Sequence, residues 1–227
     1  NEGELKSTYG TGCFVLANTG KKIIYSDKNL LTTISCKINN KVSYALEGSI
    51  FMAGGLMNWM QSSLKIFKDV SETSNIASSV NPSSNVIIVP AFSGLGAPYW
   101  SFNSKAAIYG LTQNTGRKEL IHASLQAISL QTYDLLEAFR EDFESNDISL
   151  SNSLSIDGGM TENNWFVKNL ADITNFNVYR AYTKESTALG ASLVSAIGIG
   201  YYKGLNNIKS LTNKKNKLES TIDKNLI

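Results

Sequence analysis

The sequence is poor in the residues that build disulfide frameworks, metal sites and membrane spans. Its 227 residues include two cysteines, three prolines and one histidine. Cys13 and Cys36 do not form a C-x-x-C pair, and no group of histidines and cysteines has the spacing of a metal site. No apolar run reaches the roughly 18 residues that a membrane-spanning helix needs. These absences exclude a disulfide scaffold, a zinc site and a membrane span, and they predict two reduced thiols and a cytoplasmic location.

Charge of either sign is also scarce and nearly balanced. The 21 basic residues exceed the 19 Asp and Glu residues by two, whereas a nucleic-acid-binding protein usually carries a clustered basic face. Most of the excess lies near the end of the chain, which is typical of a solvated segment: Lys209, Lys214, Lys215, Lys217 and Lys224. We therefore expect no nucleic-acid partner.

The first third of the chain predicts antiparallel strands. Apolar and β-branched runs cover residues 8–17, 21–25, 30–38 and 42–46, with turn residues at 18–20 and 39–40. Apolar residues then recur at helical spacing over 49–67. Gly54 and Gly55 lie inside this predicted helix, where two glycines cost about 2 kcal/mol relative to alanine. Their presence suggests that another group must approach the backbone there.

The rest of the chain predicts alternating helices and strands. Residues 69–84 read as a polar surface connection, 86–90 as a buried central strand and 91–116 as a long structured loop. An apolar face predicts a helix over 118–143. Strands at 154–156 and 178–180 then alternate with helices at 162–172 and 186–199, a pattern that predicts parallel strands covered by helices.

This order of elements predicts an α/β fold. Antiparallel strands followed by alternating helix and strand make up one ribonuclease-H-like lobe of the actin and sugar-kinase type ATPases, a mixed sheet with helices on both faces. We expect residues 1–205 to form this domain and residues 206–227 to form a polar, basic C-terminal segment.

Two glycine-containing turns are candidate phosphate or nucleotide sites. Gly10-Thr11-Gly12 stands at a strand start, where residues without Cβ let backbone N–H groups approach a phosphate. Asp157-Gly158-Gly159 stands between a strand and a helix, whose N-terminus attracts anions. Either motif alone is more often a plain tight turn.

Five motifs in fixed order are far more specific than either turn. They lie at residues 9–14, 44–48, 90–100, 156–159 and 187–191, and a sixth, longer signature runs from Ala106 to Gln126. In this combination, over about residues 5–205, the chain resembles the glycerol kinases of the FGGY carbohydrate kinase family. The resemblance implies the C-terminal, nucleotide-binding half of an enzyme that phosphorylates glycerol with ATP and Mg²⁺.

The resemblance also implies roles for individual residues. Thr11 would bind the nucleotide phosphates, Gly54 would lie at the ATP site, and Gly159 and Asn163 would hold the adenosine moiety. Asn58 stands where the family usually has glutamine, one methylene longer, so its contact with the nucleotide could be lost or bridged by water.

Phe14 matches the aromatic residue that covers the carbon edge of glycerol, while polar groups would hold the hydroxyls. The Gly-Asp-Gln stretch that supplies the family's catalytic base is absent, so no catalytic residue or metal ligand is assigned to this chain.

These features predict a fragment that lacks the family's N-terminal lobe and its last helix. The chain begins with Asn1 rather than methionine, and residues 1–4 do not resemble a signal peptide. The partners expected through the full-length enzyme are glycerol, ATP and the missing lobe, and that enzyme is expected to be a homo-oligomer. Two alternatives stay open: a lobe of another FGGY sugar or polyol kinase, and a non-catalytic actin-like module.

Overall fold

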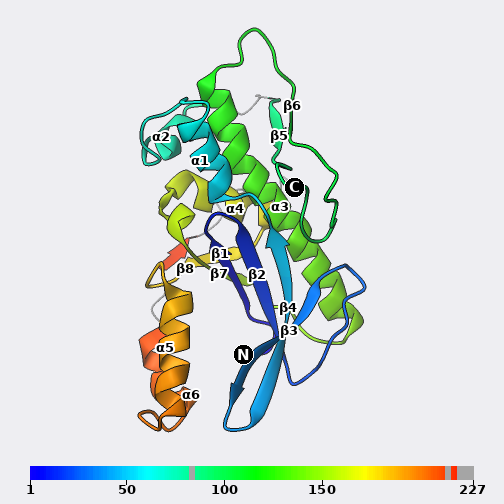
Figure 1. Ribbon diagram of the computed structural model, residues 1–227, viewed down its shortest axis with the longest axis vertical. Coiled ribbons are helices and arrows are strands. Elements are labelled where there is room, and N and C mark those ends of the chain that lie inside the picture. Colours follow the sequence, from blue (N-terminus) through cyan, green and yellow to red (C-terminus); the bar gives the residue numbers. More distant parts are fainter. Residues whose placement is uncertain (82–84, 213–215, 219–227) are drawn as a thin grey trace.

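A mixed sheet forms the centre of the molecule (Figure 1). A computed structural model describes residues 1–81, 85–212 and 216–218. Its main sheet has seven strands in the order β3-β4-β2-β1-β7-β8-β9. Strands β7 and β8 run parallel to β1, and the other pairs are antiparallel. The strands are β1 (Leu5–Tyr9), β2 (Cys13–Gly20), β3 (Leu31–Ile38), β4 (Lys41–Ile50), β7 (Ser153–Asp157), β8 (Asn177–Arg180) and β9 (Asn216–Leu218).

Helices lie on both faces of this sheet, as the predicted fold class requires. The long α3 (Arg117–Ser145) and α4 (Asn164–Thr174) pack on one face. On the opposite face of β1, Lys6 Nζ donates a hydrogen bond to Thr187 Oγ1 of α5 (Ser186–Gly198) at 3.1 Å. The other helices of the described residues are α1 (Gly54–Ser62), α2 (Glu72–Ser78), α6 (Leu205–Thr212) and the short 3-10 helix η1 (Gly159–Glu162).

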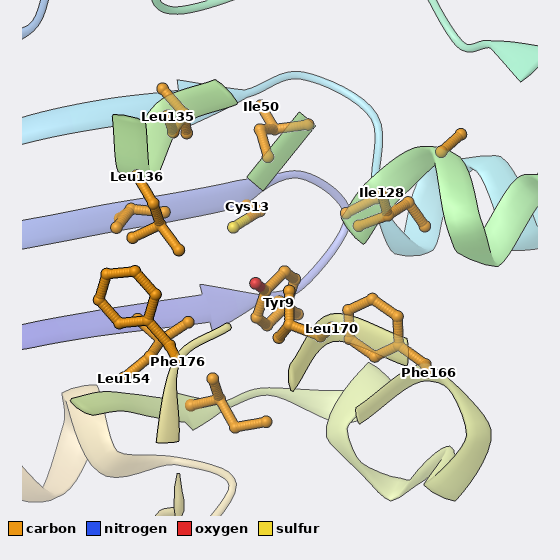
Figure 2. Packing of buried hydrophobic residues seen from close by; sticks show 14 of the residues in the cluster. Tyr9, Cys13, Ile50, Ile128, Leu135, Leu136, Leu154, Phe166, Leu170 and Phe176 are labelled. Carbon is orange, nitrogen blue, oxygen red and sulfur yellow. The ribbon is translucent and has the colours of Figure 1, made fainter. Parts of the chain in front are cut away.

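The main core lies between the sheet and the pair α3 and α4. Figure 2 shows Tyr9 and Cys13 from the strands facing apolar side chains of both helices. Tyr9 and Phe166 are fully buried, and their rings meet edge to face with centroids 5.0 Å apart. The Tyr9 hydroxyl lies 3.1 Å from Thr132 Oγ1 of α3, so its polar end has a partner in the apolar interior.

The first β-hairpin differs from the prediction. Residues 8–17 are two strands rather than one, because the chain reverses at residues 10–12 and pairs Tyr9 with Cys13. The predicted strand at 21–25 is wrong: these residues are irregular, and β2 pairs with β1 and β4 instead. The predicted helix at 49–67 is shorter, since β4 continues to Ile50 and α1 begins only at Gly54.

The middle of the chain also corrects two predictions. The connection at 69–84 contains α2. The predicted buried central strand becomes β5 (Ile87–Val89), which pairs only with β6 (Ala107–Tyr109) in a separate two-stranded sheet, and Ile87 is 54% exposed. Otherwise residues 91–116 are the long, mostly irregular loop that was expected. The predicted helices that became α3, α4 and α5 are confirmed, as are the parallel strands β7 and β8.

The predicted C-terminal segment is described only in part. It contains most of α6 and the strand β9, which pairs with β8 and extends the main sheet. Residues 213–215 and 219–227, and with them Lys214, Lys215 and Lys224, lie outside the described residues. The boundary at residue 205 stays a prediction.

The two thiols are expected to react very differently. Cys13 is fully buried beside Ser7, and burial raises the pKa of its thiol to about 12, whereas Cys36 is partly exposed. Because the thiolate is the reactive form, a thiol reagent at pH 8 should label Cys36 in the native chain and Cys13 only after unfolding. Mass spectrometry of a Cys36→Ser variant checks this, and rapid labelling of that variant without denaturant would contradict it.

Candidate nucleotide site

A cavity of about 560 Å³ opens where the β1–β2 turn meets four helical segments of the chain. Its lining comes from five separate stretches of the chain: Tyr9, Gly10 and Thr11; Gly54, Met57 and Asn58; Val70, Ser71, Thr73, Ser74 and Asn75; Leu125; and Gly159, Met160, Glu162, Asn163 and Asn164. All five residues expected at the nucleotide therefore meet at one cavity.

The β1–β2 turn forms one side of the cavity and is held by the start of α1. The backbone N–H groups of Ala53 and Gly55 donate to the Thr11 carbonyl at 2.9 and 2.8 Å, and that of Gly54 donates to the Gly10 carbonyl at 2.9 Å. A Cβ on Gly54 would lie 2.6 Å from Gly10 O. The unusual glycine is thus explained by close packing of the turn on the helix start, and it is the first residue of α1 rather than an interior one.

The Asp157-Gly158-Gly159 turn contributes Gly159 to the lining. Gly158 has φ 92°, and a Cβ there would lie 2.3 Å from the Tyr9 carbonyl oxygen. A Cβ on Gly159 would meet no atom within 4 Å. Gly158 is therefore needed for packing the turn on β1, while Gly159 leaves the cavity side of the turn open.

Asn163 acts first as a structural cap. Its Oδ1 accepts a hydrogen bond from Phe166 N at 2.9 Å, which caps α4. Its Nδ2 donates to Thr73 Oγ1 of α2, also at 2.9 Å. Both ends of the amide are thus engaged within the protein, and Asn163 ties two parts of the cavity lining together.

The described lining carries little charge. Its one charged side chain, Glu162, pairs with the exposed Lys184, and the lining contains no lysine or arginine. Within residues 1–81, 85–212 and 216–218, no three His, Cys, Asp or Glu side chains are grouped closely enough to hold a metal ion. The cavity therefore suits an uncharged group bounded by apolar and hydroxyl-bearing side chains, such as a nucleoside.

Phe14, the residue expected at glycerol rather than at the nucleotide, lies on β2 outside the cavity lining, with its side chain half exposed on the sheet face away from Cys13. Its contact with glycerol stays a prediction. The lining on and before α2 was missed, because a polar stretch was read as a connection. Its signal was the spacing of Asp69 and Glu72: the Glu72 carboxylate accepts from Asp69 N at 3.2 Å, a helix-start contact.

Comparison with known proteins identifies the family. The C-terminal domain of the FGGY family of carbohydrate kinases matches residues 5–199. Glycerol kinase of Treponema denticola is 46% identical over 92% of this chain and 42% of that protein. Glycerol kinase 1 of Pseudomonas aeruginosa is 44% identical over 92% of this chain and 41% of its own length.

Solved structures show the same fold. Plasmodium falciparum glycerol kinase with ADP superposes with a TM-score of 0.86 at 39% identity, over 99% of this chain and 44% of that one. A ligand-bound xylulose kinase of Lactobacillus acidophilus reaches 0.80 at 18% identity, which shows the fold alone. The chain spans less than half the length of these relatives. It belongs to the FGGY family of carbohydrate kinases, of which it represents the C-terminal domain.

Proposed function

We propose that the chain is the ATP-binding lobe of a glycerol kinase, an enzyme that transfers the γ-phosphate of ATP to glycerol and yields sn-glycerol 3-phosphate. The observation that carries this proposal is the single cavity lined by all five residues that the family resemblance links to nucleotide. The solved Plasmodium falciparum relative was obtained with ADP, which supports a nucleotide as the ligand.

Each part of the nucleotide has a suitable part of the site. Gly159 and Asn163, with the apolar Met160 beside them, would hold the adenosine moiety, and Thr11 would reach the phosphates from the β1–β2 turn. Gly54 supports that turn through its backbone contact with Gly10, so its role at the ATP site would be indirect. Asn58 is exposed and lines the cavity, and it would contact the nucleotide directly or through water.

Magnesium would enter with the nucleotide rather than through a protein site. The described cavity lining offers one carboxylate, Glu162, which is already paired with Lys184, and Mg²⁺ in kinases is typically held by phosphates and water with few carboxylates. The ion would neutralise the negative charge of the phosphates, because the described cavity lining contains no lysine or arginine to do so.

Catalysis would need groups that this sequence does not contain. Phosphoryl transfer requires a positioned hydroxyl and a base that accepts its proton, and the Gly-Asp-Gln stretch of the family is absent. Phe14 would contribute one wall of the glycerol site, with the hydroxyl contacts and the base supplied by the N-terminal lobe.

The proposal predicts binding without turnover. Calorimetry of this chain at millimolar ADP should show saturable binding, because the adenosine side of the cavity is preformed, and a Thr11→Val variant should bind ADP more weakly but adenosine equally. A coupled assay with ATP and glycerol should detect no glycerol 3-phosphate. If calorimetry detects no heat of ADP binding, the nucleotide site is not preformed. If the purified chain forms glycerol 3-phosphate from ATP and glycerol, the claim that it lacks the catalytic base is wrong.

Glycerol is favoured over other acceptors by the first motif. This chain reads Gly-Thr-Gly-Cys-Phe, whereas pentulose kinases typically carry Gly-Thr-Ser-Gly there, and the relatives at 41–46% identity are named glycerol kinases. A non-catalytic actin-like module would share the fold but would not require nucleotide binding.

The remaining expectations stay predictions. In the part of the chain that the structure describes, no helix combines the length and apolar character needed to cross a membrane. The cytoplasmic location and the homo-oligomeric state of the full-length enzyme are still to be measured.

A further inference from the structure

The segment from residue 70 to residue 75 forms a wall of the cavity that no sequence motif claims. We call Val70, Ser71, Thr73, Ser74 and Asn75 the α2 wall, since all five line the cavity. Val70 is 49% exposed, so it presents apolar surface to the space where a ligand would lie. The α2 wall is thus a part of the cavity lining separate from the two glycine-containing turns.

The α2 wall is fastened to the start of α4 by two hydrogen bonds. Asn163 Nδ2 donates to Thr73 Oγ1 at 2.9 Å, and Trp165 N donates to Ser74 Oγ at 3.1 Å. The Thr73 hydroxyl in turn donates to Val70 O at 2.6 Å, and Thr73 is 1% exposed. One buried hydroxyl therefore connects the α4 cap with the backbone of the apolar wall residue.

The helix behind the wall cannot hold this position through its own stability. It has seven residues, and isolated helices of fewer than about 12 residues are marginal in water. A further polar contact of α2 is on the far side, where His122 Nδ1 of α3 lies 3.1 Å from Ala77 O, and Ile76 and Ala77 pack on the core. The Thr73 and Ser74 hydrogen bonds are the contacts that join the wall itself to Asn163 and the start of α4.

We propose that Thr73 and Ser74 are positioning residues for the nucleoside part of the nucleotide. This inference rests on the proposed function, because it concerns the same cavity. Loss of either hydrogen bond should leave the cavity wider and the α2 wall less ordered. Part of the binding free energy would then be used to order the wall, and the affinity for the nucleoside would fall. The phosphate end at Thr11 lies on another element and should keep its own contribution.

The test measures ADP and adenosine affinity by calorimetry in variants of this chain. Thr73→Val keeps the side-chain shape and should weaken both ligands about fivefold, which corresponds to about 1 kcal/mol for one lost hydrogen bond. Thr73→Ser should restore both affinities. Ser78→Ala is the matched control, since the exposed Ser78 hydroxyl bonds only to Asn75 O within α2.

The outcomes separate the two proposals. Unchanged affinities in Thr73→Val, or a loss confined to ADP, would overturn the positioning role while leaving nucleotide binding intact. If the unsubstituted chain binds neither ligand, both proposals fail. Circular dichroism melting identifies a variant that does not fold, in which case Ser74→Ala, at a half-buried position, carries the same expectation.

Discussion

Replacement of Gly158 by alanine is expected to destabilise the chain by about 3 kcal/mol and to abolish ADP binding. The residue has φ 92° and ψ 167°, a region that is essentially restricted to glycine. The added Cβ would also lie 2.3 Å from the carbonyl oxygen and 2.7 Å from the carbonyl carbon of Tyr9. These are backbone atoms of β1, so the clash can be relieved only by moving the turn away from the sheet.

Urea unfolding and calorimetry of the same samples measure this effect. Gly159→Ala is the matched control: its Cβ meets no atom within 4 Å, so its stability should change by less than about 1 kcal/mol. It should still weaken ADP binding, because Gly159 lines the cavity. A Gly158→Ala variant as stable as the unsubstituted chain would show that the turn does not pack on Tyr9 as described.

Truncation of Phe166 to alanine should cost about 3–5 kcal/mol, the range for large aromatic side chains in a packed core. Phe166 is fully buried, and its ring contacts Tyr9 at a centroid distance of 5.0 Å. Because Tyr9 lines the cavity and immediately precedes the β1–β2 turn, the substitution should also weaken ADP binding. Core stability and site geometry are thus linked through one aromatic pair.

The comparison variant for this prediction is Phe102→Ala. Phe102 is 63% exposed in the long loop, so its loss should change the unfolding free energy by no more than about 0.5 kcal/mol. Equal midpoints for the two variants in urea would contradict the assignment of Phe166 to the core.

Several features could be predicted because they depend on nearby residues. The period of apolar residues in α3 follows from helix geometry, and the alternation of the last strands and helices required parallel pairing. Thr11 and Gly159 lie in glycine-containing turns that the sequence shows directly, whereas the resemblance to the family, carried by the order of the motifs, led to Gly54, Asn58 and Asn163.

Other features could not be predicted because they depend on partners distant in the sequence. Gly10-Thr11-Gly12 was recognised as a turn, yet one strand was expected over residues 8–17, and only the pairing of Tyr9 with Cys13 separates β1 from β2. The run at 86–90 suggested a central strand, but apolar sequence does not specify which strand it meets, and among the described strands β5 pairs with β6 alone.

The glycines show most clearly the difference between what the local sequence determines and what the tertiary structure determines. Sequence alone marked Gly54 as costly in a helix and Gly158 and Gly159 as a turn, because missing side chains have local conformational consequences. Only the folded chain shows that the backbone of Gly10 packs closely against Gly54 and that of Tyr9 against Gly158. It also shows that a Cβ at Gly159 would meet no other atom within 4 Å. The same holds for the α2 wall, since a short polar helix is held by a side-chain amide and a backbone N–H about ninety residues away.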